Sequence, residues 1–288
     1  MPGIPTRYIL TLSCHDVRGI VAAVTGFLAA QYGNILESAQ FGDASTGRFF
    51  LRIEFAAEEG APGEDSLKKR FHDQVAVRFG MHWELHEKAR KSRVLLMVSR
   101  YGHCLNDLLF RYATGQLAIE IPAVVSNHTD WQQVVERYGI PFYHLPVTAD
   151  GKETQEAQVL DAVRRHRIDV VVLARYMQIL SPTLCQALEG RAINIHHSFL
   201  PSFKGAKPYH QAYNQGVKLI GATAHYVTMD LDEGPIIEQE VVRVDHTYGP
   251  EELAAAGRDI ECLVLARALK CHIEHRVLLN GRKTVVFR

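Results

Sequence analysis

The sequence predicts an α/β protein with two domains, and two patterns lead to this prediction. Within the first 86 residues the expected strands and helices follow the order βαββαβ, which is typical of a ferredoxin-like module. From Val94 onward, apolar runs alternate with helical patterns, which indicates a Rossmann-like, mostly parallel open sheet with helices on both faces. A charged linker at 87–92 separates the two patterns, so we predict domains at 1–86 and 93–288.

The spacing of apolar residues defines the elements of the first domain. A strand over 7–13 precedes a helix whose apolar stripe runs from Ile20 to Leu28, and Gly33 ends this helix. The elements expected after it are strands at 34–41 and 48–55, a helix at 66–79 and a strand at 82–86.

The second domain is expected to alternate strands and helices along the chain. Strands are expected at 94–99, 119–126, 141–145, 168–174, 193–196, 219–227 and 235–244. Helices are expected from Gly102 onward and at 131–138, 152–166, 182–188 and 251–273. Pro122 predicts a bend early in its strand, and Asn280-Gly281 predicts a hairpin between 277–279 and 284–287.

Composition narrows the class of protein. The 288 residues are 47% hydrophobic and 22% charged, as in ordinary globular proteins. The formal net charge is zero, which argues against a nucleic-acid or anionic-membrane partner. No run approaches a membrane span, no signal-peptide pattern opens the chain, and the five cysteines include no CxxC pair. These features favour a cytoplasmic protein with reduced thiols and without a disulfide framework.

Polar residues at the ends of two expected strands carry the strongest chemical signal. Asn194 and His196 alternate with apolar residues, so they point to one face of a strand. His225 lies on a later strand, which runs into a loop with Asp230 and Asp232. An Asn can stabilise a carbonyl oxygen that gains charge, a His can transfer protons, and an Asp can orient the His. These residue types predict acyl-type chemistry.

Two alternatives stay open at this point. The same side chains could be strand-end groups that simply bond to the backbone. A zinc site could use His196, His197, His210 and His225, but neither a Cys pair nor an HExxH helix supports it, so we predict no metal.

Three motifs resemble the folate-dependent formyltransferase family. They are Asn194-Ile-His-His-Ser-Phe-Leu-Pro, Phe203-Lys-Gly-Ala-Lys-Pro-Tyr-His and His225-Tyr-Val-Thr-Met-Asp-Leu-Asp-Glu-Gly-Pro. The resemblance implies a formyltransferase fold, with Asn194, His196 and Asp232 as the catalytic residues. It implies a folate site that includes Met177, Gln178, Leu180, His225, Thr228 and Asp230.

The resemblance also implies a reaction. The expected activity is hydrolysis of 10-formyltetrahydrofolate to tetrahydrofolate and formate, without a cofactor, so that the formate supplies purine synthesis. The pair His196-His197, in place of His-Pro, matches the branch of the family that uses water.

Two functions other than hydrolysis are also compatible with parts of the sequence. One is formyl transfer to an amine such as glycinamide ribonucleotide. The usual Gly-Ser-Asn phosphate loop is replaced by Ser99 to Asp107, where Tyr101 and His103 crowd the site, although Arg100 keeps this alternative open. The other is an amino-acid sensor with an inactive second domain.

The first domain resembles an ACT domain, a module that commonly binds small amino acids. The similar residues are Asp16-Val-Arg-Gly-Ile-Val and Asn34-Ile, where the usual motif is Asp-x-Pro-Gly. The resemblance implies an effector, glycine or methionine, at Asp16, Gly19 and Asn34, and a homo-oligomer. A purely structural dimerisation module is the alternative.

Overall fold

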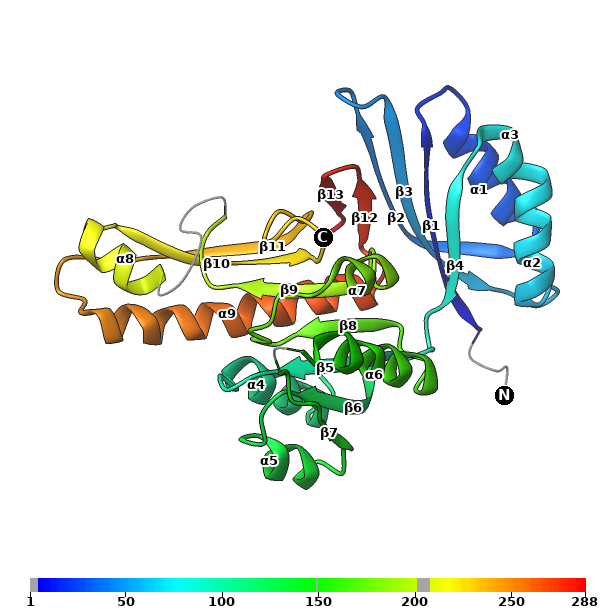
Figure 1. The fold of residues 1–288 in the computed structure, drawn as a ribbon. Coiled ribbons are helices and arrows are strands. Elements are labelled where there is room, and N and C mark those ends of the chain that lie inside the picture. Colours follow the sequence, from blue (N-terminus) through cyan, green and yellow to red (C-terminus); the bar gives the residue numbers. More distant parts are fainter. Residues whose placement is uncertain (1–4, 149, 201–207) are drawn as a thin grey trace. The chain divides into compact units, whose positions relative to one another are not determined.

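The computed structural model describes residues 5–148, 150–200 and 208–288, which form two compact units. Figure 1 shows their elements in chain order. The first unit contains the described residues of Met1–Lys91 together with Glu274–Asn280 and Val285–Arg288. The second unit contains Ser92–Ile273 and Gly281–Thr284. The sequence predicted one domain over 93–288, whereas Glu274–Asn280 and Val285–Arg288 are part of the first unit.

The first unit is built on a four-stranded antiparallel sheet in the order β2-β3-β1-β4. Its elements are β1 (Arg7–His15), α1 (Ile20–Ala30), β2 (Gly33–Asp43), β3 (Arg48–Ala57), α2 (Glu64–Phe71) and β4 (His82–Glu87). The chain order is therefore βαββαβ, as the apolar spacing predicted. The helix expected over 66–79 is interrupted by a π-helical turn, η1 (His72–Ala76), before α3 (Val77–Phe79).

Both faces of β3 are buried. One face joins an aromatic core in which Phe71 packs edge-on against Phe27 and Trp83. On the other face Arg52 is only 2% exposed, and its guanidinium donates to the carbonyl oxygen of Glu274 at 3.1 and 3.3 Å. A buried guanidinium needs acceptors, so the C-terminal segment completes the environment of this sheet.

The second unit is built on a seven-stranded sheet in the order β11-β10-β9-β8-β5-β6-β7. Its strands are β5 (Ser92–Val98), β6 (Ile119–Ser126), β7 (Phe142–His144), β8 (Val170–Leu173), β9 (Ala192–His196), β10 (Leu219–Tyr226) and β11 (Ile236–Arg243). The five strands from β9 to β7 pair in parallel, and β10 and β11 run antiparallel to their neighbours. The sheet is mostly parallel, as predicted. The β5–β6 register shifts beside Pro122, where the bend was expected.

Helices cover both faces of this sheet (Figure 1). They are α4 (His103–Ala113), α5 (Gln132–Arg137), α6 (Lys152–Arg165), α7 (Pro182–Ala187), α8 (Pro208–Gln215) and α9 (Pro250–Ile273). Residues of α6 and α7 pack on alternate residues of β5, such as Leu95 and Met97. The intervening Leu96 is also fully buried, and α9 lies against α4, β9, β10 and β11. None of the described helices is both long and apolar enough to cross a membrane.

Helix α8 differs from the sequence-based expectation, whereas the C-terminal hairpin agrees with it. Helix α8 was not predicted, because its residues form no apolar stripe and Ala212 is one of its few buried side chains. Most of the predicted motif at 203–210 lies outside the described residues. The C-terminal hairpin is present as β12 (Val277–Asn280) and β13 (Lys283–Val286), which pair with each other.

Candidate active site

Strands β9 and β10 place three polar side chains on one face of the sheet. Asn194 and His196 lie two residues apart on β9, and the antiparallel register sets His225 of β10 directly opposite Asn194. His196 and His225 are buried, at 5% and 2% exposure. The alternation of polar and apolar residues correctly predicted that Asn194 and His196 share a face of β9. The pairing of β9 with β10 places His225 on the same face.

His196 is paired with the carboxylate of Asp232. Its Nδ1 lies 3.2 Å from Oδ2 of Asp232. A carboxylate can only accept, so Nδ1 carries the hydrogen, and in the neutral imidazole Nε2 is left without one. Nε2 is buried and has no hydrogen-bond partner among the described residues. It is therefore the atom of this pair that can take up a proton.

His225 orients the amide of Asn194. Its Nδ1 donates to the carbonyl oxygen of Tyr226 at 2.9 Å, which leaves Nε2 of the neutral ring as an acceptor. Nδ2 of Asn194 lies 3.3 Å from this Nε2. One amide hydrogen of Asn194 is thus directed to His225, and the second is available to a substrate oxygen.

Asp232 is held as a carboxylate by its two histidine neighbours. Burial opposes its ionisation, but the hydrogen bond and the charge of His196, with the ring of His225 nearby, outweigh burial and keep the pKa of Asp232 well below its usual value. Its backbone has a φ of 56°, in the left-handed region that Asp tolerates better than most residues. Gly234 lets the loop return onto β10, since a Cβ there would lie 1.7 Å from the carbonyl oxygen of Tyr226.

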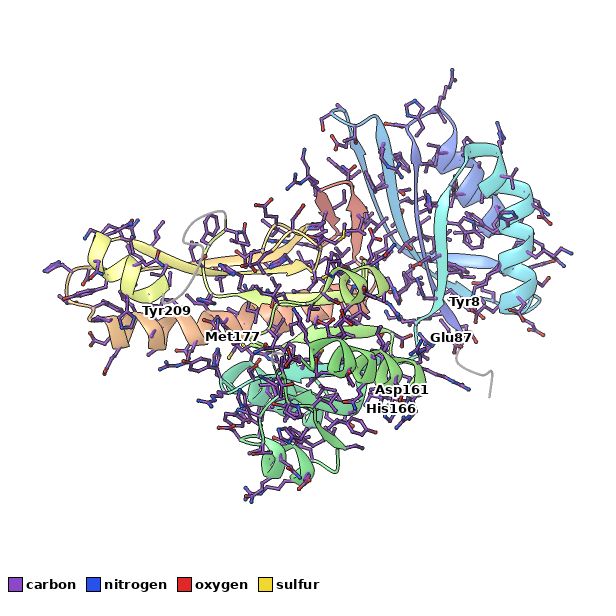
Figure 2. The ribbon with its side chains drawn as sticks, in the orientation of Figure 1. Tyr8, Glu87, Asp161, His166, Met177 and Tyr209 are labelled. Carbon is purple, nitrogen blue, oxygen red and sulfur yellow. The ribbon has the colours of Figure 1, made fainter. Side chains whose placement is uncertain are left out.

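These catalytic candidates lie at a pocket with a volume of about 250 Å³. Two segments form its other walls, residues 175–180 after β8 and residues 227–232 after β10. Four apolar side chains on these segments are unusually exposed, at 49 to 74%: Met177, Ile179, Met229 and Leu231. Met177 can be located in Figure 2, beyond the end of β8. Exposed apolar side chains around a pocket with a few polar groups are typical of a site for a flat organic ligand.

All nine catalytic and substrate residues predicted from the sequence line this pocket. They are Asn194, His196, Asp232, Met177, Gln178, Leu180, His225, Thr228 and Asp230. The four histidines of the zinc alternative do not form a metal-ligand group within the described parts of the chain.

The predicted effector residues are not brought together within one chain. Asp16 and Gly19 follow the end of β1 where His15 pairs with Arg48, whereas Asn34 pairs with Ala56, which lies opposite Arg7 at the other end. Eight strand residues separate these ends, a span of about 25 Å. The sequence motif did not reveal this separation, because pairing register is not visible in it.

The sequence did not predict the positions of several polar residues next to the pocket. His197 stacks on His196 with ring centroids 5.1 Å apart. Burial first and the charge of Arg175 second lower the pKa of His197 to about 4, so its ring is neutral at pH 7. Arg175 and His197 both line the pocket, and Arg175 lies 3.5 Å from the buried carboxylate of Glu261. Glu261 gave no signal, since it lies inside the long helix α9.

The fold and the Asn–His–Asp arrangement define an enzyme of the formyl transferase class. The family model described as "Formyl transferase" matches residues 92–269. A formyltetrahydrofolate deformylase of Corynebacterium sp. (strain P-1) is 54% identical over 282 residues, which is 98% of each chain.

Solved structures agree with this assignment. The formyltetrahydrofolate deformylase of Burkholderia mallei ATCC 23344 has a TM-score of 0.94 at 54% identity and covers 99% of this chain and 100% of its own. The glycinamide ribonucleotide transformylase 1 of Symbiobacterium toebii has a TM-score of 0.65 at 28% identity, with 69% of this chain and 95% of its own covered. This chain belongs to the formyltetrahydrofolate deformylase family.

Proposed function

We propose that this chain hydrolyses 10-formyltetrahydrofolate to tetrahydrofolate and formate. The observation that carries the proposal is the arrangement of Asn194, His196 and Asp232 at one pocket, with Nδ1 of His196 3.2 Å from Asp232. The family membership of the chain supports the same reaction.

Each of these groups has a role in the proposed reaction. Nε2 of His196 takes a proton from water while the water oxygen bonds to the formyl carbon. The formyl oxygen gains negative charge and accepts the second amide hydrogen of Asn194. The ionised Asp232 stabilises the imidazolium at His196. The bond between the formyl carbon and N10 of the folate then breaks and N10 takes the proton from His196. The product leaves as formic acid, which ionises to formate by releasing a proton to water.

The folate ring is proposed to bind between the two loops of the pocket. Gln178 and Leu180 offer backbone groups from one side, and the segment from Thr228 to Asp230 offers polar groups from the other. Met177 presents an apolar surface that is 49% exposed and suits an aromatic ring. His225 acts through the amide of Asn194 that it orients.

Incubation with 10-formyltetrahydrofolate and no amine acceptor tests the reaction. We expect one formate for each tetrahydrofolate formed. Turnover that begins only when an amine such as glycinamide ribonucleotide is added would support formyl transfer instead. Extensive dialysis against a chelator should leave the rate unchanged, since water is the only co-substrate in the proposed reaction.

The first unit is proposed to be an ACT-type regulatory module. Its antiparallel sheet in the order β2-β3-β1-β4, with α1 and α2, supports this proposal, as do the residues Asp16, Gly19 and Asn34. The amino-acid effector would be glycine or methionine. Since the two groups of residues lie at opposite ends of one sheet, a shared site would need two chains, which fits a homo-oligomer.

Two measurements test the proposed module. Calorimetry with glycine and with methionine tests effector binding, and light scattering on the full chain tests the oligomeric state. An absence of binding heat would favour a purely structural module.

The cellular role follows from the proposed reaction. Formate released in the cytoplasm would supply purine synthesis and balance the pool of one-carbon folates. Fractionation of cells that express the tagged full chain tests the location, and labelled formate recovered in purines tests the supply.

A further inference from the structure

A cluster of four polar side chains borders the catalytic end of the pocket. We call it the Glu261 cluster; its members are Glu261 of α9, His103 of α4, Tyr209 of α8 and Arg175 after β8. Nε2 of His103 donates to Oε2 of Glu261 at 2.6 Å, and the Tyr209 hydroxyl donates to Oε1 at 2.7 Å. Figure 2 labels Tyr209 on α8. Three elements and one loop thus converge on a carboxylate that is 1% exposed.

The negative charge of Glu261 is balanced by Arg175, and both of its carboxylate oxygens accept hydrogen bonds. Burial opposes ionisation of Glu261, but the donors His103 and Tyr209 and the charge of Arg175 outweigh it and lower its pKa. His103, Cys104 and Glu261 lie close enough to hold a metal ion. Nε of Arg175 lies 3.5 Å from Oε2 of Glu261, so a positive charge already lies beside the carboxylate that would bind the ion and would repel a cation. The arrangement therefore favours an ion-pair cluster over a metal site.

The Glu261 cluster is also closely packed. Tyr209 lies so near α9 that a Cβ at Gly257 would be 2.1 Å from its hydroxyl oxygen. On its other side, the ring of Tyr209 lies 6.3 Å from that of His197, which stacks on His196. The guanidinium of Arg175 lies over the ring of Tyr101 at 5.5 Å. Because Arg175 and His197 also line the pocket, the cluster and its neighbour His197 form the pocket wall beside the catalytic His196.

We infer that the Glu261 cluster determines which nucleophile receives the formyl group, because it fills the space that an acceptor larger than water would need beside His196. This inference rests on the proposed hydrolysis. Arg175 is the key member, since it alone both lines the pocket and touches Glu261. Its nitrogens Nε and Nη1 are buried without hydrogen-bond partners among the described residues, which is a cost that the packing of the cluster offsets.

The reaction that the cluster prevents is a formyl transfer to an amine. The amine nitrogen would bond to the formyl carbon, His196 would take a proton from that nitrogen, and the bond to N10 would break as N10 gains the proton. The products would be an N-formyl amine and tetrahydrofolate, without any oxidation or reduction. Glycinamide serves as the probe amine, because it is small and has no phosphate, and because a fraction of its amine is in the neutral, nucleophilic form at neutral pH.

Arg175→Gly is the decisive variant. Glycine suits the left-handed backbone at this position, where φ is 64°, and Glu261 keeps its two hydrogen-bond donors. Arg175→Lys is the matched control, because it keeps the charge and most of the volume. With excess glycinamide, we expect Arg175→Gly to raise the fraction of N-formylglycinamide at least about tenfold over wild type, equivalent to about 1.4 kcal/mol in relative barrier. Arg175→Lys should give the wild-type ratio of formate to tetrahydrofolate.

A second pair of variants covers the case in which Arg175→Gly does not fold. Tyr209→Ala removes the ring behind His197, whereas Tyr209→Phe removes only the hydroxyl, so only the first should divert formyl groups to glycinamide. The inference is overturned if neither opened variant diverts formyl groups while still producing tetrahydrofolate, or if wild type forms N-formylglycinamide. It is also overturned if glycinamide competitively inhibits the wild-type enzyme. The proposed hydrolysis fails separately, if wild type without an amine releases no formate.

Discussion

Asp232 combines an unusual backbone conformation with a negative charge that lies beside both His196 and His225. Its φ of 56° suits Asp and Asn and strains most other residues. Its side chain is 16% exposed and lies 3.2 Å from His196 and 3.6 Å from His225. Asparagine preserves the backbone and the shape of this residue, so its substitution isolates the effect of the charge.

Asp232→Asn should leave folate affinity largely intact and strongly reduce formate release. The loss reaches about 10⁴-fold when the orienting carboxylate of a serine-protease triad is replaced in this way. His196→Ala should cost about 10²–10⁴-fold through lost proton transfer, and Asn194→Ala about 10²–10³-fold through the lost contact to the oxyanion. Formate release and folate binding are measured on each purified variant. Asp161→Asn, at an exposed position of α6 away from the pocket, is the control.

The variant Asp232→Asn could instead retain more than about a tenth of wild-type turnover, far above the expected residual activity. That result would show that Asp232 is not the catalytic carboxylate. Asp230 would then be tested in its place.

His197 makes the stability of the protein depend on pH. Its pKa is about 4 in the folded protein, lowered by burial and by Arg175, against 6.5 for an ordinary histidine. Between these values the unfolded chain binds more protons, so stability rises with pH, and the contribution is lost as pH falls from about 6.5 toward 4. The slope from this one group is at most about 1.4 kcal/mol per pH unit.

His197→Gln should remove that slope, and His210→Gln, at an exposed position of α8, should keep it. Denaturant unfolding between pH 4 and 6.5 measures the difference. Equal slopes for wild type and His197→Gln would contradict the assignment.

At the scale of elements, the contact between α8 and α9 depends on a glycine. Ala normally stabilises a helix interior relative to Gly by about 1 kcal/mol. At Gly257, however, the added Cβ would lie 2.1 Å from Tyr209, so Gly257→Ala should lower the melting temperature. Gly26→Ala in α1, where a Cβ meets nothing within 4 Å, should raise it. Thermal unfolding of both variants provides the test, and a Gly257→Ala protein at least as stable as wild type would show that Tyr209 is not packed there.

The elements that the sequence predicted well are those with a regular apolar period. The alternation at β4 and the stripe of α1 are local patterns, so their positions followed directly. Helix α8 has no such stripe, and its position depends on Tyr209 reaching Glu261 on another element. The π-turn η1 within the second helical segment also escaped prediction, since it changes the bonding without changing the apolar spacing.

The candidate site divides in the same way. Asn194, His196 and Asp232 lie in motifs that resemble the family, and the family assignment is confirmed by relatives over nearly the whole chain. Their catalytic roles remain predictions. Glu261 lies 158 residues from its partner His103, so no local pattern could have connected them. The left-handed φ of Arg175 could not be predicted either, because glycine is the usual signal for this conformation and position 175 is an arginine.

At the scale of the whole molecule, the last residues of the chain stabilise the first unit. Truncation after Ile273 removes the Glu274 carbonyl that accepts from the buried Arg52, and removes Asn280, whose amide donates to Asp43 at 2.7 Å. We expect the amides of β3 to lose hydrogen-exchange protection, because the buried guanidinium of Arg52 loses the carbonyl oxygen that accepts from Nε and Nη2 and keeps its ion pair with Glu37 at 3.3 Å. Mass spectrometry on peptides from β3 measures this. Arg282→Ala, a change at an exposed ion pair, should leave those peptides unaffected. Full protection of β3 in the truncated chain would contradict the prediction.

The same C-terminal segment has a consequence for the order in which the protein can mature on the ribosome. The strands β1 to β4 are synthesised first, but Glu274 and Asn280, which bond to Arg52 and Asp43, emerge only after Ser92–Ile273 of the second unit. At about 5–20 residues per second, the nascent sheet would wait roughly 10 to 40 seconds for these groups. During that interval Arg52 lacks the carbonyl acceptor of Glu274, so we expect the N-terminal sheet to reach its full stability only after the C-terminal segment has emerged.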